Sequence, residues 1–421
     1  MIYTETYRAV EKARKKPTYL RTNEFIHTRL FDYDLHTMLL EMGPNCNLHC
    51  FHCLDECGPN RNGLPDPEIV RNAITGAIRA GVLKVCLTSG EPLREENKEA
   101  VAAAVRYSKF ILTNLVTNGT FASTYDNAIS WLYFLKKEGF DLSCKSNNLS
   151  ISFGSMYPTT QSNFRFINDA LRVIYPFTDL GQRVFYKFIG MGDIKDTKRV
   201  NELIVTINES FGKRRSERMG KVGIEDAVLV YPAEGFRLNH DEIEKYTPGP
   251  IRIVIGQVEP YGRAANLPLF QRIMPVRRLE IEDILMEHAP VTDFHVFYNG
   301  DVHFSNNGIL GRDRPYGNVS CEHLGIILHR MRMDPLFQGF KIGGTPLLYH
   351  VAQEIDTNFQ VEGRTNYDVS RTIFGKPKLV KEIREFFTAN GVVDSYKKFI
   401  ESQDLRKSGF HPREFISPQK V

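Results

Sequence analysis

Three cysteines lie close together in one short segment of the sequence. Cys46, Cys50 and Cys53 follow the spacing C-x3-C-x2-C, shortly after the apolar stretch 38–42. Three thiolates on one loop can hold three irons of a cubane iron–sulfur cluster, because soft sulfur ligands suit iron–sulfur chemistry. A four-iron cluster held this way keeps one iron without a protein ligand, and that iron can bind and polarise a small molecule. The alternatives are a zinc site or a disulfide, but no second ligand pair such as C-x2-C or H-x3-H follows in the sequence.

The bulk composition is that of an ordinary globular protein. Of 421 residues, 42% are hydrophobic and 25% are charged, and the formal net charge of +4 is too small to indicate a nucleic-acid partner by itself. No apolar run approaches the length of a membrane span, and the N-terminal segment has no apolar signal core, so we expect a cytoplasmic protein without a membrane partner. The seven cysteines argue against a disulfide scaffold and indicate a reducing compartment.

From about residue 37 the sequence alternates strand-like and helix-like segments, which predicts a parallel α/β sheet. About six β-α units can be counted, fewer than the eight of a closed triosephosphate-isomerase (TIM) barrel. The predicted strands are 38–42, 84–88, 110–112 leading to 115–117, 149–153, 183–188, 227–231 and 251–255, and the predicted helices between them are 69–80, 97–107, 125–137, 163–174 and 200–209. A basic helical segment at 5–16 precedes them.

Polar segments follow several of these strands, where the functional loops of a parallel β/α sheet lie. Ser89-Gly90-Glu91-Pro92 comes directly after the strand at 84–88, and Thr117-Asn118-Gly119 ends the next one. A glycine lets backbone groups approach a ligand closely, and a carboxylate can accept a hydrogen bond from an ammonium group. Taken alone, either segment would be an ordinary turn.

The cysteine spacing, with the aromatic Phe51 in its last spacer, resembles the signature of radical S-adenosylmethionine (radical SAM) enzymes. In that family the open iron of a [4Fe–4S] cluster chelates the amino and carboxylate groups of S-adenosylmethionine. Reduction then gives methionine and a 5′-deoxyadenosyl radical. The resemblance implies a partial (β/α)6 TIM-like barrel, a [4Fe–4S] cluster on the three cysteines, S-adenosylmethionine as cofactor, and a flavodoxin or ferredoxin as reducing partner.

The same resemblance assigns cofactor contacts residue by residue. The S-G-E-P segment is similar to the family's G-G-E-P element near the amino group, with Ser89 in place of the first glycine, and T-N-G is similar to an element near the ribose and adenine. A Gly-Arg-Ala unit at 262–264 resembles one found after the last strand. An Asn-Gly turn, a core hydroxyl and a surface lysine are the ordinary alternatives at Asn118, Ser152 and Lys187. The implied contacts are Ser89, Gly90, Glu91, Pro92, Thr117, Asn118, Ser152, Lys187, Gly256 and Gln257.

The C-terminal third resembles a SPASM or Twitch module, the α+β extension of some radical SAM enzymes. A hairpin is predicted at 294–304, followed by a G-N-V unit at 317–319 and a helix at 323–331, with later helices at 379–388 and 394–401 over the barrel opening. Only Cys321 is present there, and one thiol cannot hold an auxiliary cluster. We therefore expect a SPASM-like scaffold without a cluster, which lines a substrate pocket. The predicted divisions are 1–36, 37–275 and 276–421.

The predicted activity is hydrogen abstraction from a peptide or small natural product. Without an auxiliary cluster as electron acceptor, redox-neutral outcomes such as epimerisation, elimination or rearrangement are favoured. Cys57 and Cys321 are candidate hydrogen donors to a substrate radical; inert packing is the alternative. An RNA-modifying enzyme or a non-catalytic iron–sulfur protein is the second hypothesis. It has little support, because the basic runs at 14–16 and 213–218 are typical of solvated segments.

Overall fold

The computed structural model describes residues 35–50, 53, 55–153, 161–176, 183–190, 252–257, 276–279, 293–304, 315–363 and 366–402. Three predicted elements lie outside this part of the chain: the helix at 5–16, the helix at 200–209 and the strand at 227–231.

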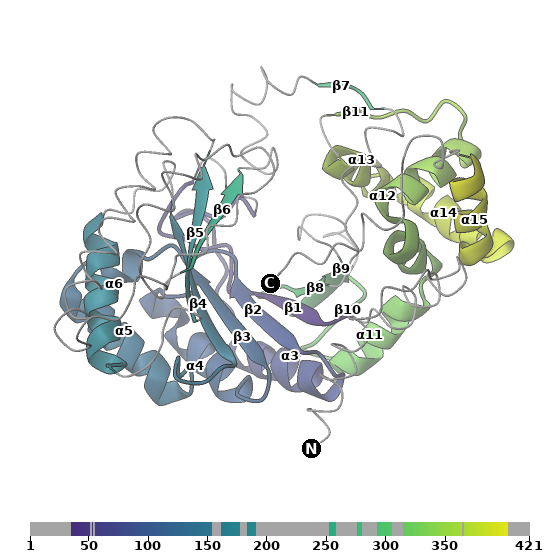
Figure 1. Ribbon diagram of the computed structural model, residues 1–421. Coiled ribbons are helices and arrows are strands. Elements are labelled where there is room, and N and C mark those ends of the chain that lie inside the picture. Colours follow the sequence, from purple (N-terminus) through teal and green to yellow (C-terminus); the bar gives the residue numbers. More distant parts are fainter. Residues whose placement is uncertain are drawn as a thin grey trace, which may run out of the picture.

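The centre of the fold is a curved sheet whose first six strands all run parallel (Figure 1). The neighbouring pairs follow chain order, as expected for successive β-α units. The predicted α/β fold with a partial barrel is confirmed. The strands are β1 (Thr37–Glu41), β2 (Lys84–Thr88), β3 (Leu112–Thr117), β4 (Asn147–Phe153), β5 (Val184–Gly190) and β6 (Arg252–Gln257).

Four amphipathic helices follow the strands and cover the outer face of the sheet (Figure 1). The side chains of Asp66 and Thr124 cap the helices that they precede, and Gly139 ends the third helix in the left-handed conformation. The helices are α3 (Pro67–Arg79), α4 (Lys98–Tyr107), α5 (Tyr125–Glu138) and α6 (Gln161–Ile174), with short 3-10 turns η2 (Glu95–Asn97) and η3 (Thr120–Ala122).

Side-chain alternation divides the sheet into an apolar face and a polar face. Leu40 and Ile151 are fully buried in the core that the helices complete. Glu41 and Ser152 follow them in sequence and therefore stand on the opposite face. The inner surface of the partial barrel thus carries the polar groups.

The third predicted strand begins later than expected. Phe110 and Ile111 lie in a turn, where the Ile111 amide donates to the Ser108 carbonyl at 3.0 Å, and the strand begins at Leu112. Phe110 is 71% exposed. The prediction of a strand at 110–112 was therefore wrong at its start, because an apolar triplet was read as buried.

The predicted C-terminal hairpin is present and extends the barrel sheet. Its first strand, β8 (Asp293–Val296), pairs in parallel with β1, and Leu40 lies opposite Val296. β9 (Asp301–Phe304) returns antiparallel to β8, and β10 (Gly317–Asn318) pairs with β9. Strand β1 therefore lies inside the sheet, between β2 and a strand from the last third of the chain.

The remaining helices form a group beside the β8–β10 end of the sheet (Figure 1). The expectation that α14 and α15 cover the barrel opening stays a prediction. The ring of Phe304 lies 5.4 to 5.5 Å from those of Phe337, Phe340 and Phe374, which joins the hairpin to the group. The elements are α11 (Leu324–Met333), α12 (Pro335–Ile355), α13 (Asn366–Phe374), α14 (Pro377–Asn390) and α15 (Val392–Ser402), with a small sheet of β7 (Arg277–Arg278) and β11 (Glu362–Gly363).

No helix in the described ranges is both long enough and apolar enough to cross a membrane.

Candidate functional site

The three predicted ligand cysteines lie on a loop, residues 43–58, that leaves β1 and folds back on itself. We call it the cysteine loop. The Cys46 amide donates to the Gly58 carbonyl at 3.2 Å, and the Gly58 amide donates to the Pro44 carbonyl at 3.1 Å. These two bonds join the ends of the loop, so the intervening cysteines are held as one unit beyond the carboxyl end of β1.

The side chains of the three cysteines differ in exposure. Cys46 is buried, whereas Cys50 and Cys53 are partly exposed. None of the seven cysteines of the chain forms a disulfide, so the structure does not show the disulfide alternative. Across the described residues, no three His, Cys, Asp or Glu side chains form a group that could hold a metal ion.

Hydrogen-bond donors surround two of the three sulfurs. Cys46 Sγ accepts from the Leu48 amide at 3.4 Å and lies 3.8 Å from Asn118 Nδ2, while Cys53 Sγ accepts from the Cys57 amide at 3.2 Å. Such donors stabilise a thiolate and tune a cluster that it binds. Burial raises the pKa of Cys46 to about 11, so bound iron would have to displace its proton. The donor set fits a thiolate-bound iron–sulfur cluster.

The S-G-E-P turn packs directly on the cysteine loop. Ser89 and Gly90 both have positive φ, +66° and +60°, a conformation that favours glycine. A β-carbon at Gly90 would lie 2.3 Å from the Gly43 carbonyl oxygen and 2.5 Å from that of Asn45. Glycine is therefore required at 90, whereas Ser89 adopts a strained conformation and places its hydroxyl 3.4 Å from Cys57 Sγ.

Glu91 links this turn to the T-N-G segment. Its carboxylate is almost fully buried and accepts three hydrogen bonds: from the Thr117 hydroxyl at 2.6 Å, the Asn118 amide at 2.6 Å and the Leu93 amide at 2.9 Å. Burial raises the pKa of Glu91, and these hydrogen bonds oppose the rise. Because protein groups already donate hydrogen bonds to this carboxylate, a ligand at this turn would contact the backbone atoms of the turn.

Asn118 closes the arrangement by reaching the cysteine loop. Its Nδ2 donates to Asn47 Oδ1 at 3.0 Å, and Asn47 Nδ2 donates to Thr120 Oγ1 at 2.6 Å. Pro92, the fourth implied contact of S-G-E-P, is the last residue of that turn. The cysteine loop, S-G-E-P and T-N-G were separate segments in the sequence, and the structure brings all three together.

The other implied cofactor contacts lie further along the sheet. Ser152 is buried near the carboxyl end of β4, opposite Lys187 on β5 in the register. Gly256 and Gln257 are the last residues of β6, opposite Ile189 and Gly190. They share the carboxyl-terminal edge of the sheet with the cysteine loop, and their contact with a cofactor stays a prediction.

The two candidate hydrogen donors have different surroundings. Cys57 is 2% exposed, and its Sγ accepts from the Gly90 amide at 3.2 Å. A hydrogen bond with the Cys53 side chain, together with burial, raises the pKa of Cys57, so it stays a thiol. Cys321 is exposed, and its thiol donates to the Asn318 carbonyl at 3.5 Å in the turn before α11. Both donor roles stay predictions.

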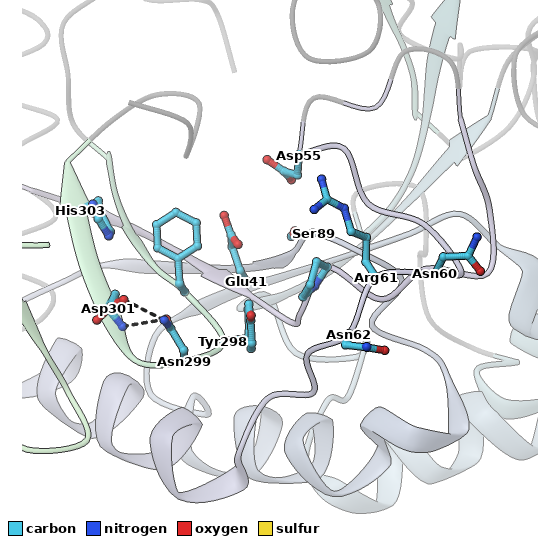
Figure 2. Close-up of a pocket in the computed structure, with 12 residues that line it drawn as sticks. Glu41, Asp55, Asn60, Arg61, Asn62, Ser89, Tyr298, Asn299, Asp301 and His303 are labelled. Atoms are coloured by element: carbon cyan, nitrogen blue, oxygen red, sulfur yellow. Dashed lines mark hydrogen bonds between the residues drawn. The ribbon is translucent and has the colours of Figure 1, made fainter. Parts of the chain in front are cut away.

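A cavity of about 450 Å³ opens between the cysteine loop and the C-terminal hairpin. Glu41, Asp55 and Arg61 contribute to one side, and Asp301 and His303 to the other (Figure 2). Phe297 also lines the cavity. Glu41 Oε1 lies 3.7 Å from Nδ1 of the equally buried His295 on β8.

Apart from Ser89, sequence reasoning missed the described residues that line this cavity. The one available signal was Glu41, a charged residue in the otherwise apolar stretch 38–42. Its partner on β8 could not be inferred, because the two strands are distant in sequence.

Comparisons with known proteins give weak but consistent likenesses. No protein-family model matches the chain. A curated relative, the probable GTP 3′,8-cyclase of Methanococcus vannielii, is 28% identical over 90 residues, 21% of this chain; the chain thus spans 30% of that relative's length. Streptococcus suis SuiB bound to S-adenosylmethionine matches with a TM-score of 0.44 and 14% identity, covering 79% of this chain and 76% of SuiB. The anSMEcpe structure with bound AdoMet matches with a TM-score of 0.40 and 13% identity, covering 89% and 98%.

Proposed function

We propose that this chain is a radical SAM enzyme in which Cys46, Cys50 and Cys53 hold a [4Fe–4S] cluster. The observation that carries the proposal is the hydrogen-bonded junction of three motifs. Asn118 reaches the cysteine loop, and Glu91 ties S-G-E-P to T-N-G. The similarity over 90 residues to a probable GTP 3′,8-cyclase supports an enzymatic role. When bound, the cluster and S-adenosylmethionine supply a 5′-deoxyadenosyl radical that removes a hydrogen atom from a substrate.

The residues of this chain hold and shield that chemistry. The Leu48 and Cys57 amides donate to the ligand sulfurs and favour their thiolate form. The positive φ of Ser89 and Gly90 brings the turn against the cysteine loop, and in this proposal the turn would hold the amino end of the cofactor. Ser152, Lys187, Gly256 and Gln257 would line the course of the cofactor along the strand ends.

The substrate we propose is a peptide or a small natural product, and the outcome is redox-neutral. The C-terminal third, a SPASM-like extension in this proposal, contains a single cysteine, Cys321, which cannot bind an auxiliary cluster alone. A substrate radical therefore has no second cluster to receive its electron. Epimerisation, elimination or rearrangement are consistent with this, and a cytoplasmic flavodoxin or ferredoxin would supply the reducing electron.

Anaerobic reconstitution tests the cluster and the cleavage together. We expect about four irons per chain, brown absorbance, and 5′-deoxyadenosine on reduction in the presence of S-adenosylmethionine. Replacing Cys46, Cys50 or Cys53 by Ala should abolish all three, while Cys144→Ala, at an exposed position outside the loop, should leave them unchanged. Retained cleavage in a ligand-cysteine variant would refute the proposal.

The redox-neutral part has its own test. Once a substrate is found, the product mass should equal that of the substrate or differ by one water. A loss of two hydrogens, or about eight irons per chain on reconstitution, contradicts it.

A further inference from the structure

We infer that the cavity between the cysteine loop and the hairpin binds the substrate through an ammonium group. This inference relies on the proposed function for the identity of the neighbouring cofactor site. Asp55 follows the ligand Cys53 by two residues, and Ser89 belongs to the S-G-E-P turn; both line the cavity. A molecule bound there lies directly against the residues proposed to hold the cluster and cofactor. The volume of about 450 Å³ falls within the range of small-molecule sites.

The charges on the cavity wall favour a cation. Among the described residues of the lining, three carry carboxylates, Glu41, Asp55 and Asp301, and one, Arg61, carries a guanidinium. The Asp301 carboxylate also accepts from the side-chain amides of Asn299 and Asn318, each at 2.8 Å. Arg61 also forms an ion pair with Glu56, a residue that does not line the cavity, with 3.5 Å between Nη2 and Oε2. The carboxylates therefore outnumber the guanidinium, and its charge is partly balanced elsewhere.

Burial strengthens this preference at one position. Glu41 is 4% exposed at the end of β1, and its carboxylate is directed toward the space that the other side chains surround (Figure 2). An ion pair formed where little water reaches is stronger than one at the surface. His295 on β8 is a titratable neighbour of this carboxylate, with 3.7 Å between Nδ1 and Oε1.

The uncharged residues of the wall agree with this reading. The rings of Phe297 and Tyr298 face the cavity, and aromatic faces attract organic cations. Phe297 is fixed by an edge-on contact with His303, at 4.8 Å between ring centroids. The amides of Asn60 and Asn62 can bind hydroxyl or carbonyl groups of the same ligand.

Two sources could supply the ammonium group: an amino sugar or related small molecule, or a lysine or N-terminus of a peptide. The experiment separates them with matched probes. Binding of glucosamine, glucose, glucuronate and a short lysine-containing peptide is measured by saturation-transfer NMR on the reconstituted holoprotein with S-adenosylmethionine. We expect glucosamine or the peptide to bind at least about tenfold tighter than glucose, and glucuronate weakest, because a charge-assisted hydrogen bond is gained or a repulsion added.

Variants locate the effect. Glu41→Gln and Asp55→Asn should each weaken amine binding about tenfold or more, and Arg61→Gln should strengthen it. Glu68→Gln removes the same charge from α3, outside the cavity lining, and should change nothing. Asp55 lies on a loop, so its variant remains informative if Glu41→Gln folds poorly.

Three results would overturn the inference: glucuronate binding as tightly as the amines, neither amine binding, or both charge variants binding amines like the wild type. Formation of 5′-deoxyadenosine without substrate is measured in parallel. If the wild type forms no 5′-deoxyadenosine, the proposed function is refuted. If it cleaves S-adenosylmethionine but shows no preference for amines, only the ammonium site is refuted.

Discussion

The two sides of the cavity are built in different ways. On the side proposed to hold the cofactor, which we call the cofactor side, the cysteine loop, S-G-E-P and T-N-G are joined by short hydrogen bonds, and the carboxylate of Glu91 accepts three of them. On the hairpin side, aromatic packing holds the wall, because the ring of Phe304 contacts those of Phe337 and Phe340 behind it. One side is therefore held by polar contacts between loops, whereas the other is held by contacts between rings.

The variant with the largest expected effect tests whether the two sides of the cavity lose their structure independently. Phe304→Ala removes a buried ring that contacts α12 and α13 and should cost about 3–5 kcal/mol of stability. Iron content and 5′-deoxyadenosine formation should persist at temperatures below the lowered melting midpoint. Phe304→Leu, which keeps most of the volume, should cost less. Parallel loss of iron in the Ala variant would show that the two sides are one cooperative unit.

The next largest effect is expected for a substitution on the cofactor side. Gly90→Ala introduces a β-carbon 2.3 Å from the Gly43 carbonyl oxygen, and we expect a cost of about 3 kcal/mol together with loss of bound iron. Gly81→Ala is the matched control, because Gly81 also has positive φ but no atom within 4 Å of the new carbon. It should cost about 1 kcal/mol and keep the iron. Equal melting temperatures for the two variants would contradict the close packing.

Glu91→Gln tests whether the junction depends on the carboxylate. Each carboxylate oxygen accepts one backbone amide, from Leu93 or from Asn118, so the NH2 of glutamine must face a donor in either orientation. We expect a loss of about 2 kcal/mol and weaker iron retention, read from denaturant unfolding and iron analysis. Thr117→Ser, which keeps the hydroxyl, should remain near the wild type.

The smallest effect concerns the strain at Ser89. Ser89→Gly should relieve the positive φ, while Ser89→Ala keeps the strain and removes only the hydroxyl. We expect the glycine variant to be about 1 kcal/mol more stable than the alanine variant in thermal unfolding. The reverse order would show that the left-handed conformation at position 89 carries no strain, because both variants lack the hydroxyl.

Sequence reasoning found the three motifs of the cofactor side, because their signals are local; that they bind a cofactor stays a prediction. The cysteine spacing, Gly90 and Asn118 each occupy a strand-to-helix loop, and strands that run parallel bring such loops to one edge. The register of the parallel strands β1, β2 and β3 is then enough to bring the three motifs together. The surroundings of Glu91 could not be read from the sequence, since Thr117 and two backbone amides donate to its carboxylate; its contact with a cofactor stays a prediction.

The hairpin side was less predictable for physical reasons. The parallel pairing of β8 with β1 depends on contacts between distant segments, which leave no local pattern. Helix α12 was missed because Gly343, Gly344 and Pro346 are typical helix breakers. Gly344, at φ 62°, is non-helical and joins two helical halves of α12 at a kink whose residues are buried.

The position of β1 inside the sheet has a consequence for how the molecule is made. During synthesis, the edge of β1 that pairs with β8 lacks this partner until β8 has left the ribosome. An unpaired strand edge can pair with other chains. The wall opposite the thiols is complete only when the last third of the polypeptide has folded. Truncations in that last third should therefore reduce the yield of folded protein before they alter its chemistry.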